Sequence, residues 1–315
     1  MRGKPSPSDE SYGRLAGPHD GTRPFDAAVD ALVAGSASRR VALRVVLPAG
    51  NSYLARCHAQ VSFQRVNQVV PLRWRVLPDD RTPSWLRPAG GASGGNRLEL
   101  TIASPTGESR TIDAASGPVF WNNRPDVFAE ARYGVAARSG RGRFRISLRP
   151  TADLDPTVAL GPAGVWTVRL KNKSVPSGAV VQAWIERDES LYGFPERGRQ
   201  SYFEDAAYVR HDHAGRDKET DDAASVVRRE STMNGMATGR NAIVAGGYIR
   251  KDMIAAPYSA AGHHVPPVGV AMSRWYGARD DSVRATEHVP RQPHGGNGTG
   301  SVETEAMLTD VSAEL

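Results

Sequence analysis

The sequence is poor in cysteine and in long apolar runs, and each shortage excludes a class of protein. Cys57 is the only cysteine among 315 residues, so an internal disulfide and a cysteine-cluster metal site are both excluded. No window approaches the ~18 apolar residues of a membrane span, and the first residues lack the apolar core of a signal peptide. The sequence therefore predicts no membrane partner and, as written, a cytoplasmic chain, although no motif names a compartment.

Lysine is scarce as well, and arginine carries almost all of the positive charge. The 40 Lys and Arg residues exceed the 34 Asp and Glu residues by a formal charge of +6. The lysines are Lys4, Lys171, Lys173, Lys218 and Lys251. This excess is small and dispersed, whereas a nucleic-acid-binding protein gathers its basic residues on one face or element. We predict no nucleic-acid partner.

The stretch from Arg40 to Ser52 has the pattern of a short buried strand that ends in a tight polar turn. Upstream, apolar residues at helical spacing predict a helix that begins at Pro24 and stops at Gly35. A helix followed by an apolar strand is one α/β unit of a parallel sheet. Ligands of such sheets bind outside the carboxyl ends of the strands, which makes Asn51 a candidate site residue.

Beyond Tyr53 the apolar period changes from 3.6 to 2, which is typical of half-buried strands. Turn signals separate these strands, as at Pro105-Thr106-Gly107 and Pro176-Ser177-Gly178. The strands are centred on Leu72–Val76, Leu98–Ile102, Phe144–Leu148, Trp166–Leu170 and Val180–Ile185. Antiparallel strands at this density predict a β-sandwich of jelly-roll kind, in which Trp74, Trp166 and Trp184 pack.

The predicted fold class is α/β: a partial subtilisin-like parallel sheet with helices, interrupted by an antiparallel β-sandwich insertion. Helix and strand signals return after the sandwich, with a short helix from Ser231 to Met236 and a strand from Ala242 to Tyr248. The predicted division is a disordered N-terminus (1–10), a split α/β domain (11–59 and 190–262), the insertion (60–189) and a weakly structured tail (263–315).

An ordered set of short segments resembles the subtilisin-like serine peptidases, and more narrowly the bacterial members with a β-rich insertion in the catalytic domain. The set is Ser11-Tyr12-Gly13, an amphipathic helix, Ala49-Gly50-Asn51-Ser52, Met233–Gly239, Ile243–Tyr248 and Pro257–Gly262. The resemblance covers roughly residues 10 to 262.

The resemblance implies a serine endopeptidase that acts on a peptide or protein substrate. It makes Asn51 the oxyanion-hole residue, and an amide donor at the end of a rigid strand is suited to that role. It also implies that Ser11, Tyr12 and Gly13 pair with the substrate backbone, and that Ala49 and Gly50 line the pocket for the side chain before the scissile bond.

The triad that such a peptidase needs is missing from the sequence. His19-Asp20-Gly21-Thr22 imitates the family's His-Gly-Thr motif, but it has an extra residue and follows Ser11-Tyr12-Gly13, so we interpret it as the turn before the helix. Methionine stands at Met253, where the nucleophile motif needs serine. We expect a truncated or degenerate member that is inactive as this chain.

The alternative is a non-catalytic module whose β-sandwich binds a carbohydrate or a protein on an α/β scaffold. We predict no cofactor and no metal. His211 and His213 lie near Asp212 and Asp217 and could form a metal cluster, but alternating histidines in a charged loop are more often solvated. The pair Gly246-Gly247 lacks the full spacing of a dinucleotide-binding loop.

Overall fold

The computed structural model describes residues 15–17, 19–38, 43–89, 97–123, 126–136, 140–186, 198–249, 254–262 and 305–306. The predicted disordered N-terminus and the edge segment Ser11-Tyr12-Gly13 lie outside these residues, and so does nearly all of the predicted tail 263–315.

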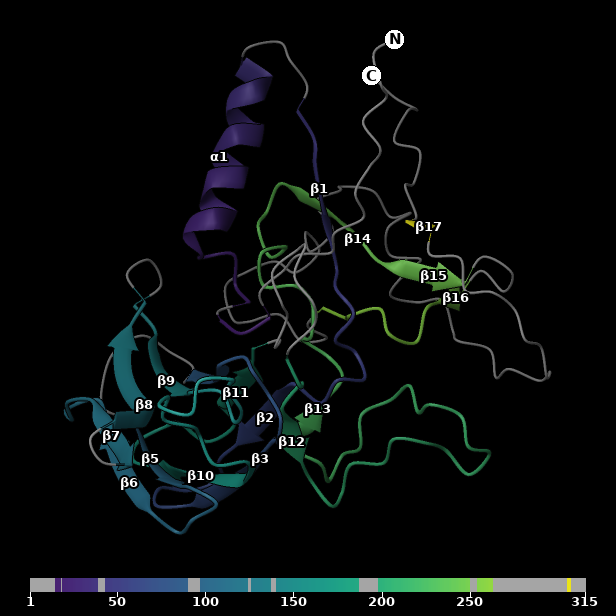
Figure 1. The fold of residues 1–315 in the computed structure, drawn as a ribbon. Helices are drawn as coiled ribbons and strands as arrows, with labels where there is room; N and C mark the ends of the chain where they lie inside the picture. The colour runs from purple at the N-terminus through teal and green to yellow at the C-terminus, as the bar shows by residue number, and fades with distance from the viewer. Residues whose placement is uncertain are drawn as a thin grey trace.

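Two antiparallel sheets pack face to face and form most of the described fold (Figure 1). The first has the order β12 (Tyr202–Glu204), β3 (Val69–Val76), β10 (Gly164–Asn172), β5 (Leu98–Ala103) and β6 (Ser109–Asp113). The second has the order β13 (Val227–Arg228), β2 (His58–Ser62), β11 (Val180–Ile185), β4 (Ser84–Ala89), β9 (Gly142–Leu148), β8 (Asp126–Val135) and β7 (Val119–Asn123). The period-2 segments of the sequence are therefore confirmed as strands.

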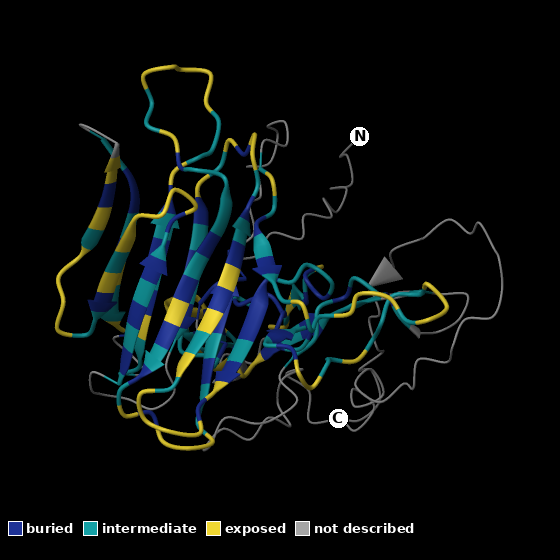
Figure 2. Ribbon diagram, turned by 90° about the horizontal axis from the view of Figure 1, so that it is seen from below, coloured by how far each residue is buried: buried dark blue, intermediate teal, exposed yellow. Residues whose placement is uncertain are grey.

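The core lies between these two sheets, because alternate residues of each strand point inward (Figure 2). Trp74, Trp121 and Trp166 are fully buried there. Trp166 lies opposite Trp74 in the β3–β10 register, and its ring centroid is 5.7 Å from that of Trp121. Trp184 is also buried. The predicted packing of Trp74, Trp166 and Trp184 is confirmed, so these three rings cannot form an exposed sugar-binding surface.

A small helical and parallel unit lies beside the sandwich (Figure 1). It contains α1 (Pro24–Ser38) and the parallel pair of β1 (Val45–Pro48) with β14 (Ala242–Ala245). The chain continues into β15 (Gly247–Ile249), which pairs with β16 (Ile254–Ala255) and β17 (Glu305–Ala306). The Asp26 carboxylate accepts a hydrogen bond from the Thr238 hydroxyl at 3.0 Å and so joins α1 to the segment before β14.

The prediction of an α/β fold built on a parallel sheet with helices is wrong. Among the described residues the only helix is α1, the only parallel pairing is β1 with β14, and every other sheet pairing is antiparallel. The physical reason is that the helix–strand pattern near the start of the sequence determines only the local structure of α1 and β1. The many period-2 strands set the class of the whole molecule.

Three predicted elements also differ from the structure. Residues Ser231–Met236 form turns rather than a helix, because their backbone N–H groups bond to distant carbonyls: Thr232 and Met233 donate to Ala261, and Asn234 donates to Ala49. The predicted strand over 242–248 is divided at Gly246. Helix α1 continues through Gly35 to Ser38.

Candidate functional site

The end of β1 is held from two sides by segments that are distant in the sequence. One residue past β1, the Ala49 N–H donates to the Ala245 carbonyl at 2.7 Å. The Ala49 carbonyl accepts a hydrogen bond from the Asn234 N–H at 2.7 Å, and the Gly50 carbonyl accepts one from the Ala260 N–H at 3.0 Å. The structure thus brings together four of the segments that the sequence singled out, namely 49–52, 233–239, 243–248 and 257–262.

Asn234 joins these segments through its side chain as well as its backbone. Its Nδ2 donates to the Pro48 carbonyl at 3.3 Å, and its Oδ1 accepts from the Met236 N–H at 3.0 Å. The side chain is buried. A buried amide with both ends bonded fixes the last carbonyl of β1 relative to the 233–237 turn. The sequence does not reveal this role of Asn234, because its pattern predicts a short helix at Ser231–Met236.

Gly50 has a φ of +96°, a value that side-chain-bearing residues rarely adopt. A Cβ added at Gly50 would lie 3.7 Å from the Asn234 nitrogen and 3.9 Å from the Ala260 Cβ, which is ordinary contact. The backbone conformation, rather than lack of space, therefore requires glycine here. The turn that Gly50 permits presents the next residue, Asn51, at the surface.

Asn51 is exposed and makes no hydrogen bond with any other residue that the structure describes. Its neighbours on the chain are fixed: Ser52 is buried, and the Tyr53 N–H donates to the Tyr258 carbonyl at 3.3 Å. An amide side chain with free donors therefore extends from a rigid turn. This arrangement can donate to a carbonyl oxygen or to an anionic oxygen.

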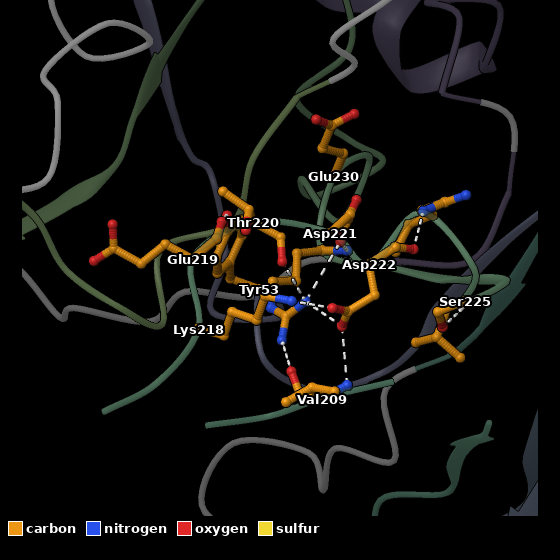
Figure 3. Close-up of polar contacts among 12 residues, drawn as sticks. Tyr53, Val209, Lys218, Glu219, Thr220, Asp221, Asp222, Ser225 and Glu230 are labelled. Carbon is orange, nitrogen blue, oxygen red and sulfur yellow. Dashed lines mark hydrogen bonds and ion pairs between the residues drawn. The ribbon is translucent and has the colours of Figure 1, made fainter. Parts of the chain in front are cut away.

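Tyr53, two residues past Asn51, belongs to a polar cluster with residues of the 209–230 segment (Figure 3). The Tyr53 hydroxyl donates to the Glu219 carbonyl. Arg229 is 1% exposed and donates to the Thr220 carbonyl at 2.9 Å and the Val209 carbonyl at 2.6 Å. Its backbone N–H donates to Asp221 at 2.6 Å. The buried Arg229 guanidinium thus joins distant parts of the charged 205–230 loop, five residues before Asn234.

Sequence reasoning gave no role to Arg229 or Tyr53. The loop reads as irregular and charged, and nothing in its pattern separates a buried arginine from the many solvated ones. Tyr53 could have been singled out, because it is an aromatic residue two positions after Asn51 and aromatic residues make up only 7% of the sequence.

The buried histidines are engaged in structural contacts. His19 and His58 both stack on Trp184, with ring centroids 4.6 and 5.1 Å away. The two ring nitrogens of His58 contact the Glu230 carbonyl at 2.6 Å and the Gln182 side chain at 2.5 Å. In the turn before α1, the Asp20 carboxylate accepts from the backbone N–H and hydroxyl of Thr22. The interpretation of residues 19–22 as a turn is confirmed.

The described residues contain neither a cluster of metal ligands nor a membrane-spanning helix. Within the described ranges, no group of three His, Cys, Asp or Glu side chains is arranged to hold a metal ion. His211 instead contacts the Asp217 carboxylate at 3.3 Å. Over the same ranges, no helix has the length and apolar character needed to cross a bilayer.

Among known proteins, only solved structures are found to be similar to this chain. No protein-family model matches the chain, and no curated protein matches it. Among solved structures the fold is similar to that of the Clostridium perfringens CspB protease, with 15% sequence identity and a TM-score of 0.55. The match covers 81% of this chain and 44% of the protease, so the chain spans less than half of the length of that protein. The likeness shows a shared fold.

The prediction that the chain is a subtilisin-like peptidase is wrong. The described fold is β-rich with a single helix, unlike the helix-covered α/β sheet of that family, and no family model matches. The segments that carried the resemblance are three to seven residues long and rich in Gly, Ala, Asn and Ser, which tight turns of many folds use.

Proposed function

We propose that this chain is a peptidase-related protein in which the turn Ala49-Gly50-Asn51 receives a peptide. The observation that carries the proposal is the exposed Asn51 amide, free of partners among the described residues, on a turn fixed by Asn234 and Ala260. The structural likeness to a protease supports the same reading. The class of reaction is hydrolysis of a peptide bond.

In this proposal Asn51 stabilises the oxygen of a tetrahedral intermediate in serine-type acyl transfer, with the attacking serine supplied by sequence outside this chain. A donor at a fixed position stabilises the transition state most when negative charge develops on that oxygen, because the site need not reorganise during the reaction. Ala49 and Gly50 would border the side chain before the scissile bond. Ser11, Tyr12 and Gly13 keep their proposed role of pairing with the substrate backbone.

The nucleophile and its base are not assigned to this chain. His58 is held by Glu230 and Gln182, and the Nε2 atom of His19 contacts the Leu15 carbonyl at 2.6 Å, so neither contact activates a serine. We therefore expect that a fluorophosphonate probe leaves the purified chain unlabelled. Labelling of any serine contradicts this part of the proposal.

A tetrahedral analogue tests the role of Asn51 without requiring turnover. A peptidyl phosphinate carries an anionic oxygen where the parent peptide has a carbonyl. The Asn51→Ala variant should weaken phosphinate binding by about tenfold or more while changing parent-peptide binding little, because the donor acts mainly on the charged oxygen. Asn122→Ala, at an exposed asparagine of β7, is the matched control. Equal losses for both ligands would remove the oxyanion role.

A further inference from the structure

The outward face of β4, β9 and β8 carries an arginine and tryptophan surface distinct from the Asn51 turn. Along β9, Phe144, Ile146 and Leu148 point into the core, so Arg143 and Arg145 point outward. On neighbouring β4, Leu86 is buried and Trp85 shares the outward face. We call Trp85, Arg132, Arg143 and Arg145 the Arg–Trp patch.

Two arginines of the patch face each other across the strands. Arg132 of β8 lies directly opposite Arg145 of β9 in the register. Like charges in this position destabilise a sheet. The Arg145 guanidinium lies over the Trp85 ring, with its central carbon 5.6 Å from the ring centroid. A cation over an aromatic face is attracted by the ring, so this contact favours a position of Arg145 beside Trp85.

The carboxylates near the patch already have partners. Glu130 pairs with Arg132, Glu186 with Arg87 at 3.7 Å, and Asp20 with Arg141 at 3.1 Å. The guanidinium groups of Arg143 and Arg145 have neither an ion pair nor a hydrogen bond to any residue that the structure describes, although the backbones of both residues pair within the sheet. The patch therefore keeps two positive charges that no described carboxylate neutralises, and Arg143 is exposed.

We propose that the Arg–Trp patch binds an extended acidic segment of a partner protein. Arg143 and Arg145 are two positions apart on β9, which is about 6.6–6.8 Å along the strand. Alternate carboxylates of an extended peptide have the same spacing, and a guanidinium binds a carboxylate through two parallel N–H donors. Two free arginines suit a short acidic peptide better than a nucleic acid, which engages roughly six to ten basic contacts. The inference does not depend on the role of Asn51.

Fluorescence anisotropy with a labelled peptide of alternating glutamate and alanine tests the proposal on the full chain. We expect binding that weakens as salt is raised through 0.15 M, because Arg143 is exposed and Arg145 is only partly buried. Arg143→Gln combined with Arg145→Gln should weaken binding by about tenfold. Trp85→Leu should give a smaller loss. Arg169→Gln, an exposed arginine of β10 on the other sheet, should bind like the wild type.

Control measurements make the result decisive. The single variants Arg143→Gln and Arg145→Gln, with melting temperatures checked against the wild type, separate loss of charge from loss of fold. Equal binding of a peptide with glutamine in place of glutamate overturns the proposal, and so does unchanged affinity in the double variant. Binding of heparin or a single-stranded oligonucleotide without binding of the acidic peptide overturns it as well.

Discussion

Asp26 is a buried carboxyl group that connects α1 to the loop before β14. Its Oδ2 accepts from the Thr238 hydroxyl, whereas its Oδ1 is buried without a hydrogen-bond partner among the described residues. Burial raises the pKa of Asp26, and the Thr238 and Arg23 contacts oppose that rise without cancelling it.

This raised pKa gives a stability prediction with a defined sign. The contribution of Asp26 is fully present below pH 3.8, its ordinary pKa, and is lost as the pH rises through the raised folded-state pKa. Asp26→Asn removes the charge and keeps the shape. Urea unfolding from pH 3 to 7 should therefore show the variant gaining stability relative to the wild type as the pH rises. A difference that stays constant with pH would contradict the account.

Arg229 is the most deeply buried charge of the loop that supports Tyr53. Removing one partner of a buried charged network leaves the others uncompensated, at a cost of about 3–5 kcal/mol. Arg229→Met should lower the free energy of unfolding by this amount and speed hydrogen exchange in residues 209–222. Arg216→Ala, in a partly exposed pair with Asp212 of the same loop, should cost less than about 1 kcal/mol. Similar losses in the two variants would refute the role of Arg229.

Helix α1 contains a glycine, Gly35, at a position where the surrounding residues leave room for a side chain. Gly35 lies inside the helix, and a Cβ added there would meet nothing within 4 Å. Glycine in a helix is less favourable than alanine by about 0.5–1 kcal/mol. Gly35→Ala should stabilise the protein by that amount in chemical denaturation, whereas Gly50→Ala should destabilise it because φ is +96° there. Stabilisation by both changes would contradict the assigned backbone roles.

The same elements show what sequence could predict. The alternation at Trp166, Val168 and Leu170 predicted a half-buried strand because period 2 follows directly from strand geometry. The turn at Asn51 was also predictable, since Gly50 marks it. The turn conformation of Ser231–Met236 was not predictable, because it depends on hydrogen bonds to Ala49 and Ala261 that form only in the folded protein. The support that Arg229 gives to Tyr53 is hidden for the same reason.

At the scale of the whole molecule, the segment before α1 meets the β-sandwich where His19 stacks on Trp184 of β11, whose other neighbour is His58 of the same sheet. The Trp184 indole N–H also donates to the Ser231 carbonyl at 2.9 Å, three residues before Asn234. The Arg–Trp patch lies on the same seven-stranded sheet as Trp184, whereas the Asn51 turn follows β1 of the two-stranded parallel sheet.

Photo-crosslinking reports directly whether a peptide binds at the Asn51 turn. A library of extended peptides carrying benzophenone is irradiated with the wild-type chain and with Asn51→Ala, and the linked residues are mapped by mass spectrometry. The account predicts crosslinks within residues 47–54 and 256–262 that the substitution reduces. Crosslinks confined to other surfaces, or crosslinks at this turn that Asn51→Ala leaves unchanged, would contradict it.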